Sequence, residues 1–187
     1  MRLILASASR GRRMLMEEWG VPFEVMVSDV EEPVDGFNNP RTFVQEVSFS
    51  KAQAVANRIE EGIIVAADTI GWMDGKPLLK PENREHAFSM IRSMQGHLHE
   101  LWTGMVVWQK PSDKILMVQE RSLVRMAPLT DKEIDDYLDT RIWQGCSGSY
   151  AVQRPTDPLM EVVSGTVENV IGLPIQTLRA ILKPFGF

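Results

Sequence analysis

A continuous apolar run at residues 63–67 most constrains how this chain folds. It contains only Ile, Val and Ala and is bounded by Gly62 and Asp68. A strand with one face in water alternates apolar and polar residues, so an unbroken run indicates a central strand covered on both faces. Ligands of open α/β sheets bind beyond the carboxyl ends of the strands. We therefore expect Asp68, which with Thr69 ends this strand, to be functional.

The remaining patterns predict an α/β fold, with a mixed twisted sheet that has long antiparallel arms and flanking helices. Strands are predicted at residues 3–6, 21–27, 63–67, 76–79, 98–109, 115–126, 149–153 and 160–164. Helices are predicted after Ser9 up to Gly20, from the cap Asn39 to about Ile59, from Asn83 to Gly96, from Thr130 to about Asp139, and after Leu173. The two longest strands form the arms.

Length and charge limit the classes of protein that fit this sequence. The 187 residues, 44% of them hydrophobic, are enough for one domain, residues 1–187, which could have two lobes. The net charge of −5 argues against an extended nucleic-acid surface. No apolar run approaches the roughly 18 residues of a membrane span, and the N-terminus lacks a signal-peptide pattern. With Cys146 as its lone cysteine, the chain offers no disulfide framework, and we expect a cytoplasmic protein without membrane partners.

The segment after the first predicted strand has the composition of an anion-binding site. Ser7 and Ser9 lie in the turn, and Arg10, Arg12 and Arg13 lie in the first turn of the helix. A helix N-terminus already attracts anions through its free N–H groups and its dipole. Arginines there oppose the dipole, so three of them favour a strongly negative ligand such as a polyphosphate. A solvated basic turn is the alternative for this motif alone.

Further acids and bases stand at the ends of other predicted elements: Glu32, Lys51, Asp68 and Lys80. Lys51 lies within the apolar stripe of its helix, where a charge is costly unless it reaches solvent or meets an anion. Each residue alone could be a surface charge. Carboxylates combined with Lys and Arg suit a hard divalent cation and a phosphate ester.

Other well-known catalytic templates are absent. The chain has no phosphate-loop, dinucleotide-binding or HExxH motif, and Ser147 lies outside a nucleophile elbow. His86, His97 and His99 are interpreted as polar residues on a solvated face, and we assign them no role.

Eight short motifs together resemble a known family. They are LASASRGRRMLMEEWGVPFEV, SDVEE, SKAQAVA, VAADTI, LLKPENREHAFSMIRSMQGHLHELWTG, TDKEIDDYL, GSYAVQ and ENVIGLP. In this order and spacing they are similar to the Maf branch of the Maf/HAM1-like nucleotide pyrophosphatases, and they cover nearly the whole chain.

The resemblance implies an enzyme that hydrolyses nucleoside triphosphates between the α and β phosphates, releasing the monophosphate and pyrophosphate. It also implies Mg²⁺ or Mn²⁺ as cofactor. The implied fold is elongated, of the ITPase/Maf type, with a central cleft, and such proteins are often homodimers. Related enzymes remove non-standard nucleotides from the nucleotide pool.

The family's functional residues carry over to matching positions of this sequence. Asp68 matches the catalytic acid, as general base or metal ligand, and Glu32 matches an acid that shares the metal. The phosphate-binding positions correspond to Ser7, Ser9, Arg12, Lys51 and Lys80, to which we add Arg13. The positions that select the nucleotide correspond to Gly11, Thr69 and Gln153.

Two departures from the family pattern bear on function. Gly11 replaces an arginine that contributes to substrate choice in the branch preferring dTTP and UTP, although Thr69 and Gln153 fit that branch. A branch preferring 7-methyl-GTP has tryptophan at the first of these positions, and that substrate is the alternative. Arg10 or Arg13 could supply the missing guanidinium. At residues 145–148 the chain reads Gly-Cys-Ser-Gly, where the family often has Asp-Lys-Ala-Gly.

A different class of function also fits the departures. A nucleotide-binding regulator of cell division that has lost turnover would tolerate both changes. Retention of Asp68, Glu32, Lys51 and Lys80 argues against it, because a binding protein needs no carboxylate that activates water.

Overall fold

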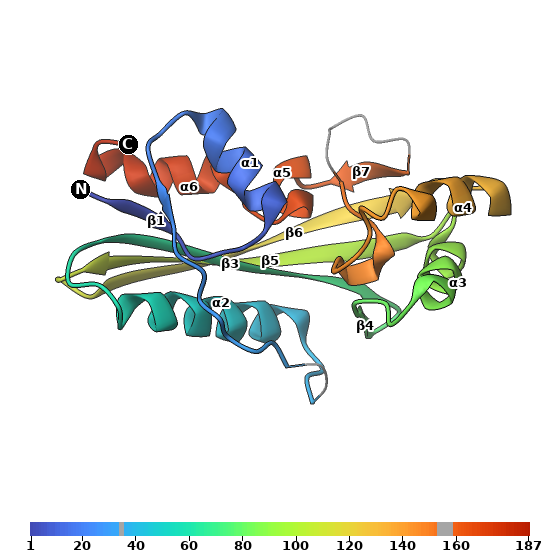
Figure 1. Ribbon diagram of the computed structural model, residues 1–187, viewed down its shortest axis with the longest axis horizontal. Coiled ribbons are helices and arrows are strands. Elements are labelled where there is room, and N and C mark those ends of the chain that lie inside the picture. The colour runs from blue at the N-terminus through green and yellow to red at the C-terminus, as the bar shows by residue number, and fades with distance from the viewer. Residues whose placement is uncertain (34–35, 153–158) are drawn as a thin grey trace.

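The predicted central strand is the first part of a longer one, β3 (Gly62–Met73). It lies within a seven-stranded mixed sheet in this computed structural model, which describes residues 1–33, 36–152 and 159–187. The strand order is β2-β1-β3-β5-β6-β7, and β4 pairs with the same edge of β3 as β1 does, but farther along the strand (Figure 1). The molecule is elongated along β3, β5 and β6, as expected (Figure 1).

The sheet combines a short parallel part with a long antiparallel part. Its other strands are β1 (Leu3–Leu5), β2 (Glu24–Val25), β4 (Lys76–Leu78), β5 (Leu98–Lys110), β6 (Lys114–Met126) and β7 (Met160–Ser164). β1 pairs in parallel with β2 and β3, whereas the other pairs of these strands are antiparallel. The predicted long arms are β5 and β6.

Three of the helices begin at the predicted capping residues Asn39, Asn83 and Thr130. The helices are α1 (Arg10–Trp19), α2 (Pro40–Ala56), α3 (Arg84–Met94), α4 (Asp131–Asp139), α5 (Val167–Ile171) and α6 (Ile175–Leu182), with 3-10 turns at Ser147–Ser149 and Lys183–Phe185. The side chains of Ser9, Asn39, Asn83 and Thr130 each accept a backbone N–H of the first turn. Thr130 and Glu133 form a complete capping box.

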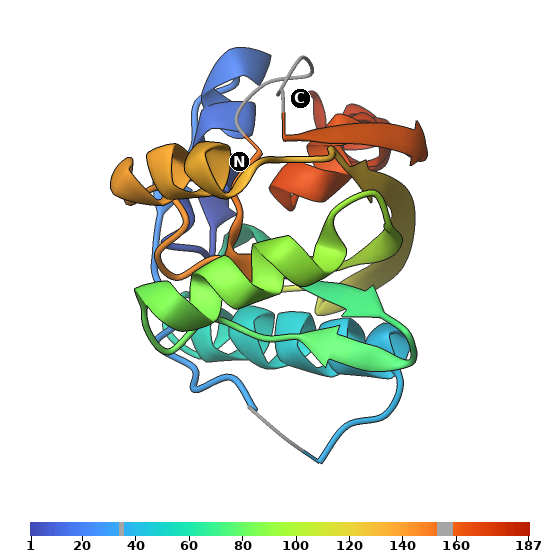
Figure 2. The ribbon, with the colours of Figure 1, turned by 90° about the vertical axis from the view of Figure 1, so that its right-hand side faces the viewer.

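Helices cover both faces of β3, which confirms the interpretation of the apolar run. α2 lies on one face, and α1 and α6 lie on the other (Figure 1). Ile64 and Ala66 pack in the cluster on the α2 face, while Ile63 and Val65 pack in the cluster on the α1 face. α3 and α4 pack together over the far ends of β5 and β6 (Figure 2). None of the helices in the described residues combines the length and apolar character needed to cross a bilayer.

Several predicted boundaries are wrong. The strand expected at 21–27 is only Glu24–Val25, and α2 ends at Ala56, before Ile59. Residues 149–152 do not form the predicted strand: Ser149 belongs to a 3-10 turn and has a φ of 64°, and residues 150–152 after it are irregular. Residue 153 lies outside the described residues. The short helix α5 was not predicted.

The interpretation of His99 as a polar residue on a solvated face is also wrong. His99 points inward from β5 and is 1% exposed, with Nε2 2.6 Å from the Oη of Tyr150. Desolvation lowers its pKa to about 4, despite a backbone hydrogen bond at His97 that acts in the opposite direction. His99 is therefore a neutral core residue at pH 7.

Candidate active site

Asp68 and Thr69 lie at a gap along one edge of β3. β1 pairs with this edge at residues 63–65 and β4 pairs with it at residues 71–73, so neither strand contacts residues 66–70. The sequence predicted Asp68 at the end of its strand, and this is wrong, because antiparallel pairing with β5 extends β3 to Met73. The parallel part of the sheet nevertheless ends at residue 65, so Asp68 lies just beyond its carboxyl edge.

Strand alternation sends these two neighbouring side chains to opposite faces of the sheet. Ile64 and Ala66 face α2, so Asp68 does as well, whereas Thr69 shares the α1 face with Val65. The gap between β1 and β4 thus presents a carboxylate to one helix and a hydroxyl to another.

Lys51 joins the two predicted carboxylates. Its Nζ lies 2.7 Å from Oδ1 of Asp68 and 2.7 Å from Oε1 of Glu32, and Lys80 Nζ lies 2.6 Å from Oε2 of Glu32. Lys51 is 7% exposed and Asp68 is 5% exposed. The alternative in which Lys51 reaches solvent is therefore wrong, because the lysine is buried against anions.

This environment separates the proton affinities of the two acids. Burial raises the pKa of Asp68 above its ordinary value, although Lys51 and Arg12 act in the opposite direction. Burial also opposes ionisation of Glu32, but the hydrogen bonds and positive charges of Lys51 and Lys80 together outweigh it and lower the pKa of Glu32 to about 2. Glu32 is thus a permanent anion, whereas Asp68 is the better proton acceptor of the two.

Arg12 is held from three sides on the other face of the gap. Its Nε donates to the carbonyl of Gly172 at 2.7 Å, Nη1 donates to Ser7 Oγ at 3.2 Å, and Nη2 donates to Thr69 Oγ1 at 3.1 Å. Arg12 is 8% exposed, and its partners in the described residues are all uncharged. Among contacts with the described residues, one N–H on each terminal nitrogen stays free for an anionic ligand.

Most of the predicted site residues line one cleft of about 790 Å³. From the prediction it includes Ser7, Ser9, Gly11, Arg12, Glu32, Lys51, Asp68, Thr69 and Lys80. Arg13 is not part of it, because this exposed side chain turns outward and its Nε lies 3.1 Å from Oε1 of Glu17. Gln153 lies outside the described residues. Arg10 lines the cleft, so of the two arginines considered as a replacement for the guanidinium missing at Gly11, only Arg10 is placed there.

The cleft has an apolar wall near α5. Leu101, Val152, Val170 and Ile171 line this side. Gly11 faces Ile171 so closely that a Cβ at position 11 would lie 2.8 Å from its Cγ2. A side chain at position 11 would therefore require Ile171 to move.

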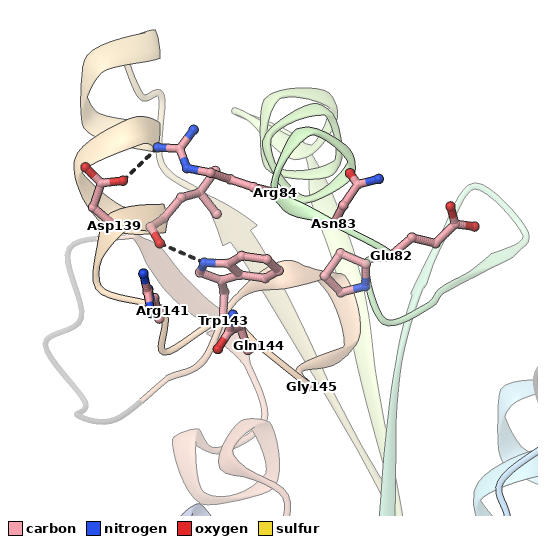
Figure 3. Close-up of a pocket in the computed structure, with 10 residues that line it drawn as sticks. Glu82, Asn83, Arg84, Asp139, Arg141, Trp143, Gln144 and Gly145 are labelled. Carbon is pink, nitrogen blue, oxygen red and sulfur yellow. Dashed lines mark hydrogen bonds and ion pairs between the residues drawn. The ribbon is translucent and has the colours of Figure 1, made fainter.

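A second pocket of about 620 Å³ adjoins the cleft and shares Arg141, Gln144 and Gly145 with it. Figure 3 shows it between the start of α3 and the end of α4. Its polar groups are largely engaged: Arg84 pairs with Asp135 and Asp139, and Trp143 Nε1 donates to a backbone carbonyl (Figure 3).

Comparison with known proteins agrees with this geometry. A family model described as "Maf-like protein" matches residues 2–185. The chain belongs to this family.

Named relatives extend the match. A dTTP/UTP pyrophosphatase of Caldanaerobacter subterraneus subsp. tengcongensis is 38% identical, covering 98% of this chain and 88% of the relative. A dTTP/UTP pyrophosphatase of Clostridium tetani is 38% identical and covers 100% of this chain and 98% of the relative. The Staphylococcus aureus Ham1 protein has a similar structure, with a TM-score of 0.56 and 12% identity over 98% of this chain and 99% of that one. The expected Maf family and ITPase-like fold are confirmed.

The donor set of this Maf-like protein fits a divalent cation. The described residues contain no group of three or more His, Cys, Asp or Glu side chains that could enclose a metal. Mg²⁺, however, is usually held by one or two carboxylates together with phosphate oxygens. Glu32 and Asp68 supply such carboxylates, and Oδ2 of Asp68 accepts no hydrogen bond from the described residues. These two residues would hold the metal.

The sequence interpretation missed residues that support the site from behind. Thr103 Oγ1 lies 2.9 Å from Thr69 Oγ1 and donates to the carbonyl of Asn169 at 3.0 Å. Gly172, which accepts from Arg12, caps α5 with a φ of 115°. The ENVIGLP motif contains Asn169 and Gly172, but their distance along the chain from Arg12 hid the contact.

Proposed function

We propose that this protein hydrolyses nucleoside triphosphates between the α and β phosphates, with Mg²⁺ or Mn²⁺ as cofactor, and that dTTP and UTP are its preferred substrates. Membership of the Maf-like family and the names of its relatives support this class of reaction. The observation that carries the proposal is the Glu32–Lys51–Asp68 bridge in a cleft that also holds Arg12.

Each of these side chains has a role in phosphoryl chemistry. The oxygen of a water molecule attacks the α phosphorus, the bond to the bridging oxygen breaks, and pyrophosphate leaves with that oxygen. Asp68 accepts the proton of the water, for which its raised pKa is suitable. Arg12 and Lys80 offset the charge that develops on the phosphate oxygens. A bound divalent cation would supply further charge neutralisation for the phosphates.

The cleft also bears on which base is accepted. Its apolar wall can contact the face of a base, and Gly11 leaves the α1 side without a side chain. The names of the relatives favour dTTP and UTP over 7-methyl-GTP, which stays the alternative substrate.

The first experiment measures pyrophosphate release from dTTP, UTP, CTP, GTP and 7-methyl-GTP, with Mg²⁺, with Mn²⁺ and with chelator. We expect release from dTTP and UTP that requires the cation. Asp68→Asn should lower kcat by about 10²-fold or more, because it removes the proton acceptor.

Arg12→Ala and Arg13→Ala form a matched pair for this experiment. Arg12→Ala should abolish most activity, whereas Arg13→Ala should change kcat/KM little, since Arg13 lies outside the cleft. Arg10→Ala tests whether Arg10 replaces the guanidinium missing at Gly11. Release no greater than that of Asp68→Asn with every nucleotide would refute the enzyme and leave the nucleotide-binding regulator.

A further inference from the structure

Arg141 is a cation of the cleft that the described residues leave unpaired. Lys51 and Lys80 are paired with carboxylates, and Arg12 is hydrogen-bonded on three sides. Arg10 and Arg141 are the cleft-lining cations without a side-chain hydrogen bond or ion pair to any described residue. Figure 3 likewise draws no dashed line from Arg141, although other polar groups around it are engaged.

The backbone at Arg141 is unfavourable for an arginine. Its φ is 60°, in the left-handed region that glycine occupies at no steric cost. The turn is fixed on both sides, because Arg141 N donates to the carbonyl of Leu138 and Gln144 N donates to the carbonyl of Arg141. Non-glycine residues in this region cluster at functional sites, where a side chain is kept despite the strain.

The segment that carries Arg141 lies beside Lys80. Ser147 Oγ donates to the carbonyl of Leu78, and Gly148 N donates to the carbonyl of Leu79 at 3.1 Å. These contacts fasten residues 147–148 to the chain immediately before Lys80. Between residues 140 and 149, Arg141 is the single charged residue. An anion bound to Lys80 would therefore lie next to residues 140–149, and Arg141 is the one charged residue of that segment.

The positive charge of the inner cleft is small compared with the negative charge of a triphosphate. Arg12, Lys51 and Lys80 face Glu32 and Asp68 in the inner part of the cleft. These charges leave a net of one positive charge, whereas the triphosphate of a nucleotide carries several negative charges. An unpaired guanidinium at the edge of the cleft is also suited to bidentate contact with phosphate.

We propose that Arg141 binds the polyphosphate of the substrate from the Lys80 side of the cleft. Its ligand is the proposed substrate, so the inference rests on the proposed function. The adjoining pocket gives the side chain room to approach the cleft from outside.

The test measures binding of sodium tripolyphosphate, which has phosphates but no base, by isothermal titration calorimetry. Arg141→Gly and Arg141→Gln should each weaken binding about tenfold, the effect of losing about one charge-assisted contact. Arg141→Lys should recover part of the affinity. Binding of thymidine and uridine, which have a base but no phosphate, should not change.

Two controls separate this effect from folding and from net charge. Arg141→Gly should melt at the same temperature as the wild type or higher, because glycine suits the φ of 60°. Arg92→Gln also removes one exposed arginine, but on α3 and outside the cleft lining. It should leave tripolyphosphate binding unchanged.

The outcomes also separate this inference from the proposed function. Wild-type affinity in both Arg141→Gly and Arg141→Gln would overturn the role of Arg141, as would an equal loss in Arg92→Gln. If the wild type releases no pyrophosphate but Arg141→Gly loses tripolyphosphate binding, the activity fails while the role of Arg141 stands.

Discussion

At the scale of single residues, the donor and acceptor of each hydrogen bond in the chain Arg12–Thr69–Thr103–Asn169 are fixed. Thr103 has a single hydroxyl proton and donates it to the carbonyl of Asn169. Thr69 must therefore donate to Thr103 and accept from Arg12. The hydroxyl of Thr69 is thus engaged on both sides. It positions Arg12 rather than offering a free donor to a base.

Thr103 is consequently a positioning residue, and we predict that Thr103→Val weakens the site through Arg12. Thr103 is fully buried. The loss of its hydroxyl leaves Thr69 without an acceptor and Asn169 without a donor, which costs about 1–3 kcal/mol of stability. We expect kcat/KM to fall about tenfold, mainly through KM, as the phosphate contact loosens.

Thr103→Ser is the matched control, because it keeps the hydroxyl. It should have nearly wild-type KM, measured by initial rates of pyrophosphate release. If Thr103→Ser and Thr103→Val lower kcat/KM equally, packing rather than the hydroxyl is responsible, and the positioning role is wrong.

Single residues also show what the sequence could predict. Lys51 was identified because a charge within the apolar stripe of a helix requires a partner, and Asp68 because it follows an apolar strand at its carboxyl end; the structure pairs the two. Thr103 and His99 could not be found in this way. Both are polar residues on an amphipathic strand, and burial makes them structural only after β5 packs against Asn169 and Tyr150.

At the scale of elements, a glycine sets how closely α2 approaches the sheet. Gly104 pairs across the sheet with Asp68. A Cβ at Gly104 would lie 2.3 Å from the carbonyl oxygen of Val44 in α2. The helix therefore rests directly on the backbone of β5. This close approach brings Lys51, two turns after Val44, within 2.7 Å of Asp68.

We predict that Gly104→Ala displaces α2 and disturbs the Lys51–Asp68 pair. The clash is with backbone, which cannot rotate away, so the free energy of unfolding should fall by about 1–3 kcal/mol or more. Activity should fall in the fraction that stays folded.

Gly71→Ala in β3 is the comparison for this prediction. There the new Cβ would lie 3.0 Å from both Cβ and Cδ1 of Leu78, a milder approach than the 2.3 Å at Gly104. Urea unfolding should show a smaller loss than for Gly104→Ala. Equal losses would mean that strand flexibility, not the α2 contact, explains both.

Elements differed in how well their patterns predicted them. The starts of α2, α3 and α4 were predicted correctly from their capping residues, because capping is a local interaction. The predicted strand at 149–153 failed where the 3-10 turn at Ser147–Ser149 packs on β4. The full length of β3 was missed because its second half is defined by pairing with β5, which is distant in sequence.

At the scale of the whole molecule, β3, β5 and β6 run through both ends of the elongated shape (Figure 1). One end contains α1, α2 and α6, and the other contains α3 and α4. Because the same long strands contribute to the cores of both ends, we expect residues 1–187 to unfold as one cooperative unit. His99 lies in the α3–α4 end, so its protonation should lower the stability of the entire molecule.

We predict that acid destabilises the protein through His99. Its pKa is about 4 in the folded protein, against 6.5 for an ordinary histidine. The unfolded chain therefore binds a proton more readily, so the stabilisation is fully present above pH 6.5 and is lost as the pH falls toward 4. At about 1.4 kcal/mol per pH unit, the loss is about 3 kcal/mol.

Urea unfolding at pH 7, 5.5 and 4 measures this loss, with tryptophan fluorescence and far-UV circular dichroism as two probes. Carboxylates also titrate in this range, so the informative quantity is the difference between the wild type and His99→Gln. The variant cannot be protonated there, and its stability should fall less between pH 7 and pH 4 by about 3 kcal/mol. Equal slopes in both proteins would contradict the role of His99. Separate unfolding transitions for the two probes would contradict the single cooperative unit. They would mean that the two ends of the molecule unfold independently, although they share the long strands.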